Sequence, residues 1–509
     1  MINRTSISRR EATISIGAVG IASLTSRSAH ARGGSIKIGI SALPPGLGNP
    51  LSSLGFPALS IWPAVFDTLV QVDARGDLVP SLALSWEPEG EQSWLISLRP
   101  GVQFSNGEAC DAKAIVATFG VLNSPQGRTQ AVYRDAKTIA RAEVVDPLTV
   151  RLHTVTPDAA LPGKLTGIRI LPPDYFSETG FSDFARAPVG TGPFMAERWD
   201  QRSVELVPNP LAWRPPVLDR ISILPVPGAV GRLQALLSGG VDIAMNINPE
   251  DGAMVEMFGG RTKITARAAV LALQFILEKK SPLTDARVRR ALNLAVNRRQ
   301  ITEYILAGAT VPATQLAVPE AFGYAPGLPL IEHDLEQAQM LMAEAGYADG
   351  FRLPMTMTLG SSPNDTAVFQ QVAADLARIG VELVIKTIPL GQFSRFLYDG
   401  DWGDALAFAF HYGSMPSLDS TIGLRFNSCL WPVPWVCDPT ISDLVLASDQ
   451  IFNQAKRKHL LQDIQRRLVA DLPCLILHET RFQNGLSGRI SQFDAPFGLI
   501  DYATLRVRI

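Results

Sequence analysis

Between residues 284 and 410, amphipathic helical patterns alternate with short apolar runs, and this order constrains the fold more than any other feature of the chain. In each helical pattern the apolar residues recur every three or four positions, as on the buried face of a helix. Asp285 and Asp334 stand where N-cap residues are preferred, and Gly346 and Gly380 stand where glycine commonly ends a helix. The alternation predicts an α/β lobe, because helices that connect strands cover the faces of a sheet. The helical patterns cover 285–297, 334–346 and 368–380, and the strand patterns cover 381–388 and 405–410.

A second lobe is expected from residues 35–275, where strand patterns dominate. The chain has 509 residues, which is enough for roughly three domains. Its content of 46% hydrophobic and 18% charged residues is typical of a well-packed globular protein and excludes a disordered one. The formal net charge of −2 provides no basic excess of the kind that nucleic-acid binding requires. The predicted fold class is therefore α/β, with two lobes and mixed sheets.

The first 31 residues have the pattern of a signal peptide. Arg9 and Arg10 precede a Gly-rich apolar stretch at 12–24, and 29–31 reads Ala-His-Ala, a small-x-small cleavage site. The paired arginines favour the twin-arginine export route, with a soluble N-terminal helix as the alternative. No later stretch reaches about 18 uninterrupted apolar residues, so no membrane span is expected in the mature chain.

Four cysteines are few for an exported chain of this length, so disulfides are not expected to carry the fold. Cys429 and Cys437 flank a short loop and are expected to form a disulfide in an oxidising compartment, the alternative being two free buried thiols. Cys110 and Cys474 stand in apolar contexts and are expected to be buried and unpaired.

Signatures of catalysis and of metal binding are missing from the sequence. It has no Gly-x-Ser-x-Gly elbow, no Walker loop and no Cys-x-x-Cys, and its six histidines are scattered. No catalytic residue, metal or cofactor is therefore expected. His411 follows the predicted strand 405–410, where ligand clefts of α/β proteins form, so a structural role, a ligand contact and a metal ligand all stay open for it.

Residues 78–108 combine strand and turn signals. The apolar run 94–98, the turn 99–101 and the run 102–104 predict a strand pair, followed by a turn at Asn106-Gly107. The segment also resembles the "lvPsLAesWe…tftLRpGVkFhdGe" signature of the peptide/nickel class of extracytoplasmic solute-binding proteins, family 5, which serve bacterial ABC importers. Further segments resemble motifs of this class in the same order, namely 65–70, 189–194, 209–213, 235–242, 285–292 and 334–347.

The resemblance implies a two-lobed periplasmic binding protein of the large type II class with an extra subdomain. Lobe I is then expected to combine 32–71, 186–276 and 480–509, the extra subdomain to cover 72–185, and lobe II to cover 277–479. Two crossovers, near 273–279 and 477–482, are expected to form the hinge.

Ligand is expected to bind between the lobes. In peptide-binding members an aspartate after a lobe II strand pairs with the α-ammonium of the peptide, but here Gly413 or Ser414 stands at that place and Asp419 comes several residues later. A peptide-like or other organic solute, held by aromatic stacking and backbone hydrogen bonds, is therefore expected. The proline- and glycine-rich loop 43–57 is a further candidate, the alternative being an exposed connector. The predicted ligand contacts are Asn49, Phe56, Trp402, Phe410, His411, Tyr412, Ser414, Asp419 and Trp431.

The predicted function is capture of a small organic solute, peptide or peptide-like, and its delivery to an ABC permease driven by a cytoplasmic ATPase. The protein is expected to be a monomeric periplasmic binding protein without enzymatic activity. It is expected to bind no nucleic acid and to reach the membrane only through the permease. The alternatives are a nickel or metal-chelate binding protein of the same class and a secreted hydrolase with dispersed catalytic residues.

Overall fold

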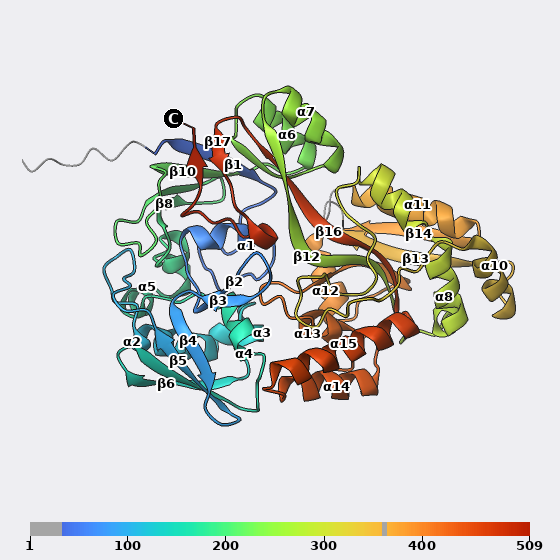
Figure 1. Cartoon of the computed structure of the whole chain (residues 1–509), viewed down its shortest axis with the longest axis horizontal. Helices are drawn as coiled ribbons and strands as arrows, with labels where there is room; N and C mark the ends of the chain where they lie inside the picture. The colour runs from blue at the N-terminus through green and yellow to red at the C-terminus, as the bar shows by residue number, and fades with distance from the viewer. Residues whose placement is uncertain (1–32, 359–363, 509) are drawn as a thin grey trace, which may run out of the picture. The chain divides into compact units, whose positions relative to one another are not determined.

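The computed structural model describes residues 33–358 and 364–508. The predicted signal peptide lies outside the described residues. A ten-stranded mixed sheet forms the centre of the fold (Figure 1). In order across the sheet, its strands are β14 (Val381–Ile388), β13 (Phe351–Thr358), β15 (Ala407–Gly413), β12 (Arg261–Phe275), β16 (Cys474–Leu486), β11 (Ile243–Ile247), β1 (Ser35–Ile40), β10 (Arg220–Pro225), β9 (Val204–Pro208) and β8 (Phe194–Trp199).

Two large hydrophobic cores lie at opposite ends of this sheet. One core packs around β1 and β8–β11, and another packs around β13–β15. The antiparallel strands β12 and β16 join the two ends and pair with each other along almost their whole length. Their register shifts between Ala266 and Ala269, where Ala268 adopts a positive φ of 53°. The predicted lobe boundaries stay predictions, but the predicted crossovers fall within or directly after these two strands.

The α/β alternation predicted for the second lobe is confirmed. β13 pairs in parallel with both β14 and β15. The Asp285 carboxylate accepts a hydrogen bond from the Arg287 amide at the start of its helix, and Asp334 accepts one from the Gln337 amide. Both aspartates thus act as the predicted N-caps, which satisfy amides that have no partner within the helix. The helices of this part are α8 (Ala286–Ala295), α9 (Arg298–Gln300), α10 (Leu335–Glu344), α11 (Asp365–Ala377), α12 (Leu390–Tyr398), α13 (Thr421–Leu424), α14 (Pro439–Asp449) and α15 (Gln454–Asp471).

A separate four-stranded antiparallel sheet lies within the predicted extra subdomain. Its strands in order are β4 (Ala83–Pro88), β5 (Ser93–Leu98), β7 (Thr149–Thr154) and β6 (Ile139–Asp146). The strand pair predicted for 94–104 is wrong, because β5 pairs with β4 and β7 and not with 102–104. The turn signals themselves are confirmed, since Gly101 and Gly107 adopt φ values of 74° and 93°.

The remaining elements lie in the first half of the chain and at its C-terminal end. The short strands are β2 (Val70–Val72), β3 (Leu78–Pro80), β17 (Ile490–Gln492) and β18 (Arg506–Val507). The helices are α1 (Ala58–Ile61), α2 (Ala112–Asn123), α3 (Tyr133–Ala136), α4 (Leu161–Lys164), α5 (Pro173–Arg186), α6 (Ala229–Leu237) and α7 (Gly252–Met257). Over residues 33–358 and 364–508, no helix has the length and apolar content needed to cross a bilayer.

Candidate functional site

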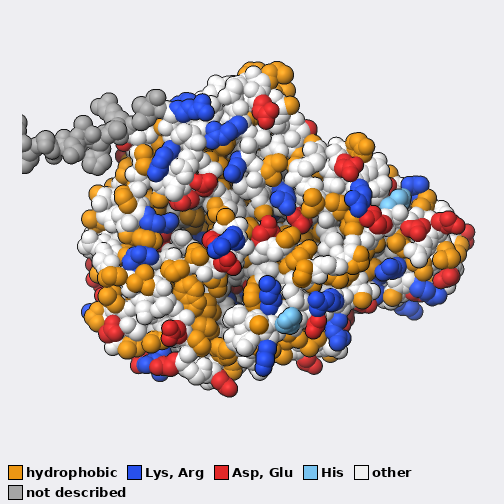
Figure 2. Space-filling model, viewed as in Figure 1, with side chains coloured by type: hydrophobic (Ala, Val, Ile, Leu, Met, Phe, Trp, Pro, Cys, Tyr) orange, Lys and Arg blue, Asp and Glu red, His pale blue; other side chains and the backbone are white. Residues whose placement is uncertain are grey.

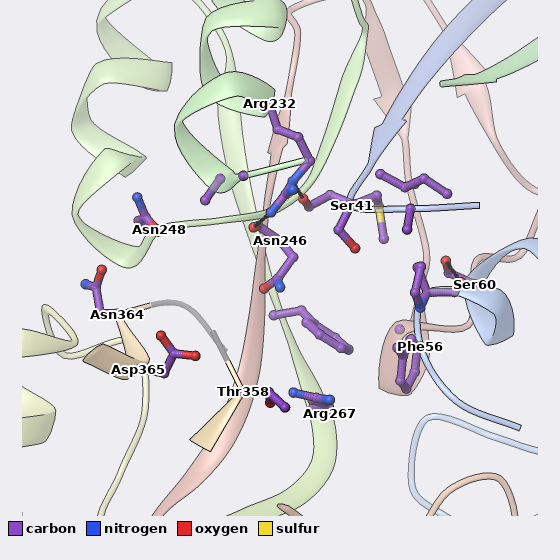
Figure 3. Close-up of a pocket in the computed structure, with 18 of the residues that line it drawn as sticks. Ser41, Phe56, Ser60, Arg232, Asn246, Asn248, Arg267, Thr358, Asn364 and Asp365 are labelled. Atoms are coloured by element: carbon purple, nitrogen blue, oxygen red, sulfur yellow. Dashed lines mark hydrogen bonds between the residues drawn. The ribbon is translucent and has the colours of Figure 1, made fainter. Parts of the chain in front are cut away.

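A cavity of about 700 Å³ opens where the ends of β1, β11 and β13 meet the crossing strands β12 and β16 (Figure 3). This volume falls within the range of small-molecule binding sites. One part of its wall comes from the side of the first core, and another comes from the first turn of α11 on the side of the second core. The first part contributes Ile40, Ser41, Ala42, Phe56, Pro57, Ser60, Gly228, Ala229, Arg232, Met245, Asn246, Asn248, Arg267, Phe482 and Gly498. The second contributes Thr358, Asn364, Asp365, Thr366, Ala367 and Gln370.

Arg232, in α6, anchors the end of β11 and the residue that follows β10. Its guanidinium donates to the carbonyl oxygens of Met245 (2.6 Å), Val226 (2.9 Å) and Asn246 (2.7 Å). The side chain is only 4% exposed, and burial lowers the pKa of Arg232 from its usual value. Because its hydrogen bonds go to neutral carbonyls, Arg232 brings a positive charge to the cavity wall without a carboxylate to cancel it.

Asn246 is held in a strained conformation by this anchor. Its φ is 54°, in the left-handed region that few residues other than glycine and asparagine adopt. The Asn246 amide N–H donates to Asn484 Oδ1 at 3.0 Å, and its carbonyl accepts from Arg232. Its side-chain Oδ1 is buried without a hydrogen-bond partner among the described residues. In Figure 3 this side chain lies between Asp365 on one side and Phe56 on the other. A strained residue with an unused buried acceptor is typical of a functional site.

The first turn of α11 forms the facing wall. Asn364 donates through Nδ2 to Glu250 Oε2 (2.8 Å) and to the Ile305 carbonyl (3.0 Å). Asp365 is 6% exposed, and its carboxylate accepts from the Thr366 amide at 2.8 Å. The bond from Asn364 to Glu250 therefore ties the second side of the cavity to the first.

Arg267 lies in β12, one of the two strands that join the ends of the sheet, and His411 lies in the neighbouring strand β15. The guanidinium of Arg267 stacks over the Phe482 ring at 5.3 Å from its centroid, and burial lowers the pKa of Arg267 to about 10, so it stays charged at neutral pH. Burial, together with the charge of Arg267 and of His478, keeps the pKa of His411 well below its ordinary value. His411 is therefore neutral, and its Nδ1 lies 3.3 Å from Thr480 Oγ1.

Of the predicted ligand contacts, Phe56 lines this cavity, with its ring centroid 4.9 Å from that of Phe482. Asn49 serves a turn instead: it donates to Gln130 Oε1 and accepts from the Leu51 amide, both at 3.0 Å. Neither Asn49 nor any of the seven predicted contacts from 402–431 is among the lining residues of the cavity.

The contacts predicted in 402–431 are held by partners within the protein. Phe410, Tyr412 and Trp431 pack with Phe408, Phe426 and Trp435 in an aromatic cluster whose neighbouring ring centroids lie 4.7–6.3 Å apart. The Tyr412 hydroxyl bonds to Gln274 Oε1 and accepts from Asn427 Nδ2 at 3.0 Å.

The polar and indole groups beside this cluster are also enclosed. Asp419 forms a 2.6 Å ion pair with Arg457, and Ser414 is 2% exposed. Trp402 packs against the hydrophobic core that contains Phe410, Tyr412 and Trp435. A ligand role for these residues stays a prediction. Cys429 and Cys437 form a disulfide, and Cys110 and Cys474 are free and buried.

Several cavity residues were not predicted from the sequence. Asn246 lies near the end of β11 and Asn248 directly follows this strand, at the kind of strand end where ligand sites of α/β proteins gather, and this position was the available signal. No local sequence pattern indicated Arg267, because its position in the cavity wall depends on the pairing of β12 with β16. In the described part of the chain, no group of three or more His, Cys, Asp and Glu side chains is arranged to hold a metal ion.

Comparison with known proteins assigns the family. Residues 77–427 match the family described as bacterial extracellular solute-binding proteins, family 5. The glutathione-binding protein GsiB of Salmonella paratyphi A is 31% identical over 309 residues, which is 59% of this chain and 59% of that protein. GsiB of Pectobacterium atrosepticum is 27% identical over 463 residues, covering 84% of this chain and 85% of that protein.

A solved structure supports the fold. The periplasmic binding protein DppA from Helicobacter pylori, in complex with the peptide STSA, superposes with a TM-score of 0.78 at 21% identity and covers 94% of this chain and 99% of that one. This likeness shows the predicted two-lobed α/β fold. Because the family match covers more than half of the sequence, the chain belongs to family 5 of the bacterial extracellular solute-binding proteins.

Proposed function

We propose that this protein is the solute-binding component of an ABC importer, which captures a small peptide-like solute in the 700 Å³ cavity and delivers it to a membrane permease. The observation that carries the proposal is that residues from both ends of the central sheet line the same cavity. A ligand that contacts both walls favours the closed arrangement over an open one by its differential binding free energy.

The bond between Asn364 and Glu250 supports this mode of action. It joins Asn364 in one wall to Glu250, which lies two residues after the lining residue Asn248 of the other, and its acceptor is a carboxylate, which makes such hydrogen bonds stronger than neutral ones. Ligand and bond would then stabilise the same closed state, which is the form that the permease would recognise.

The chemistry of the wall favours binding without catalysis. Among the lining residues that the structure describes, no histidine or cysteine occurs, and the ionisable side chains are two arginines and one aspartate. An arginine does not lose its proton in proteins, so it can orient an anion but cannot act as a general base. The family assignment points the same way, because its curated relatives are named for the solute they bind.

Location and partners follow from the same proposal. We place the mature protein in the periplasm as a monomer, exported by residues 1–31 and in contact with the membrane only through the permease. The surface is consistent with this, since Lys and Arg side chains are interspersed with Asp and Glu side chains on the face shown in Figure 2. A surface with mixed charges has no large field of one sign that would attract nucleic acid.

Ligand-induced thermal stabilisation tests the proposal. Glutathione and short peptides should raise the melting temperature, because a ligand at 100 times its Kd stabilises the folded state by about 2.7 kcal/mol. Ser41→Trp, which places a large side chain in the cavity, should abolish the shift, whereas Ser85→Trp on the exposed strand β4 should preserve it. A shift that survives in Ser41→Trp would place the ligand elsewhere.

A further inference from the structure

We infer that the cavity selects acidic peptide-like solutes, which carry more carboxylates than ammonium groups. We also infer that the side-chain amide of Asn246 forms hydrogen bonds with their backbone. This inference rests on the proposed function and names its substrate class.

The charges of the wall are unequal. Arg232 and Arg267 contribute two positive charges, and Asp365 contributes one negative charge. Glu250 is close by, but its carboxylate accepts from Asn364 and does not line the cavity. A bound solute therefore meets a net positive wall, which stabilises an anion more than a cation at the short distances and reduced dielectric of an enclosed site.

The orientation of two helices adds to this charge. α6 begins at Ala229 and α11 begins at Asp365, so both helices present their N-terminal turns to the cavity. The partial positive charge of a helix N-terminus favours carboxylates over ammonium groups. Asp365 stands at one of these turns and is the one acidic side chain among the described lining residues.

The side chain of Asn246 has the groups needed to hydrogen-bond to a peptide backbone. The side-chain Oδ1 is buried without a hydrogen-bond partner among the described residues. A carboxamide has acceptor and donor groups side by side, which matches the N–H and C=O groups of a peptide bond. Arg232 and Asn484 hold the Asn246 backbone in its left-handed conformation, so the amide is positioned before ligand enters. An unpaired buried acceptor is costly, and a ligand that pairs with it recovers that cost as affinity.

Three tripeptides of equal length test the charge selection on the unaltered protein. At neutral pH, Glu-Ala-Gly carries a net charge of −1, Gln-Ala-Gly of 0 and Lys-Ala-Gly of +1. Titration calorimetry should show affinity falling in that order, by about tenfold for each unit of charge. Equal affinities or the reverse order would overturn the inference and leave the proposed function standing. If none of the three nor glutathione binds, the proposed function falls and the inference falls with it.

Two substitutions test the role of Asn246. Asn246→Asp keeps the shape and adds a negative charge, so the preference for Glu-Ala-Gly over Lys-Ala-Gly should shrink by about tenfold or more. Asn246→Gly keeps the left-handed backbone without strain, and the affinity for all three peptides should fall by about tenfold, because one hydrogen-bonding side chain is lost. Unchanged affinities in both variants would remove Asn246 from the site.

The matched control is Ala307→Gly. Ala307 is exposed, has a φ of 48° and lies outside the cavity, so its substitution relieves a left-handed residue without touching the ligand. It should leave all three affinities unchanged. If Ala307→Gly weakens binding as much as Asn246→Gly does, the loss reflects backbone flexibility and the assigned role of Asn246 is wrong.

Discussion

The cavity wall around Asn246 and the aromatic cluster around Phe410 both place polar and aromatic side chains near the ends of buried strands, but they use them differently. In the cluster, the Tyr412 hydroxyl is bonded to Gln274 and Asn427, the nearby Asp419 carboxylate is paired with Arg457, and the rings pack on one another. In the cavity wall, Asn246 has an unused acceptor, and two arginines face one aspartate. The comparison teaches that residue type and strand position do not by themselves identify a ligand site. Buried polar atoms without a partner among the described residues occur in both regions, Asn246 Oδ1 in the wall and Trp402 Nε1 beside the cluster, so what distinguishes the wall is the 700 Å³ cavity that it borders.

The first prediction tests whether the region of the cluster is structural. Arg457→Met removes the partner of Asp419, whose side chain is 10% exposed, and should lower the free energy of unfolding by about 3–5 kcal/mol, because a buried carboxylate loses its partner. Burial alone would raise the pKa of Asp419, but the charge and hydrogen bonds of Arg457 and Thr421 outweigh it and lower this pKa. Urea denaturation measures the loss.

The control is Arg287→Met, which breaks a pair with Asp285 whose side chains are 50% and 28% exposed. Such a pair is worth about 1 kcal/mol or less. If Arg457→Met instead leaves stability intact and weakens ligand binding, the region would contribute to the ligand site after all.

The second prediction concerns the free energy of unfolding at acidic pH. Burial lowers the pKa of His478 to about 4, whereas an unfolded histidine titrates near 6.5. The unfolded state therefore binds the proton first, and the stability that neutral His478 contributes is lost as the pH falls from about 6.5 to about 4. His478 should account for about 3 kcal/mol of the loss, measured by urea denaturation as the difference between the unaltered protein and His478→Gln, because buried His411 also has a lowered pKa and adds its own loss as the pH falls.

His478→Gln should flatten this part of the pH dependence, and the exposed His459→Gln should not. Identical profiles for the unaltered protein and His478→Gln would show that His478 does not carry the effect.

The third and smallest prediction concerns the hydroxyl of the cluster. Tyr412→Phe should lower the free energy of unfolding by about 1–2 kcal/mol, because Gln274 loses a buried hydrogen-bond partner while the ring packing stays. Tyr398→Phe, at an exposed ring, should change it by a few tenths at most. Chemical denaturation separates the two, and a larger fall in ligand affinity than in stability would assign the Tyr412 hydroxyl to the ligand.

Local patterns predicted much of the fold. The caps Asp285 and Asp334, and the patterns that predicted α10, α11, β14 and β15, depend on neighbouring residues and appear as expected. The strand β13 was not predicted. The 94–104 strand pair failed because β5 finds its partners β4 and β7 through non-local pairing, which turn residues do not encode.

The site was predicted less completely for a related reason. Phe56, which lines the cavity, was among the predicted contacts because it lies in the proline- and glycine-rich loop 43–57. Asn246 was missed because its strain and its unpaired oxygen arise only when Arg232 and Asn484 reach it from elsewhere in the chain.

The two long strands β12 and β16 have a mechanical consequence. They form a two-stranded ribbon that is the hydrogen-bonded link within the sheet between its two ends, so sliding one end past the other would break many backbone bonds at once. Bending at the register shift would break fewer of them, because the ladder between β12 and β16 is already interrupted between Ala266 and Ala269. Arg267 lies inside that interruption and also in the cavity wall. A bend at this point would therefore move the charge of Arg267 relative to the cavity of the candidate site.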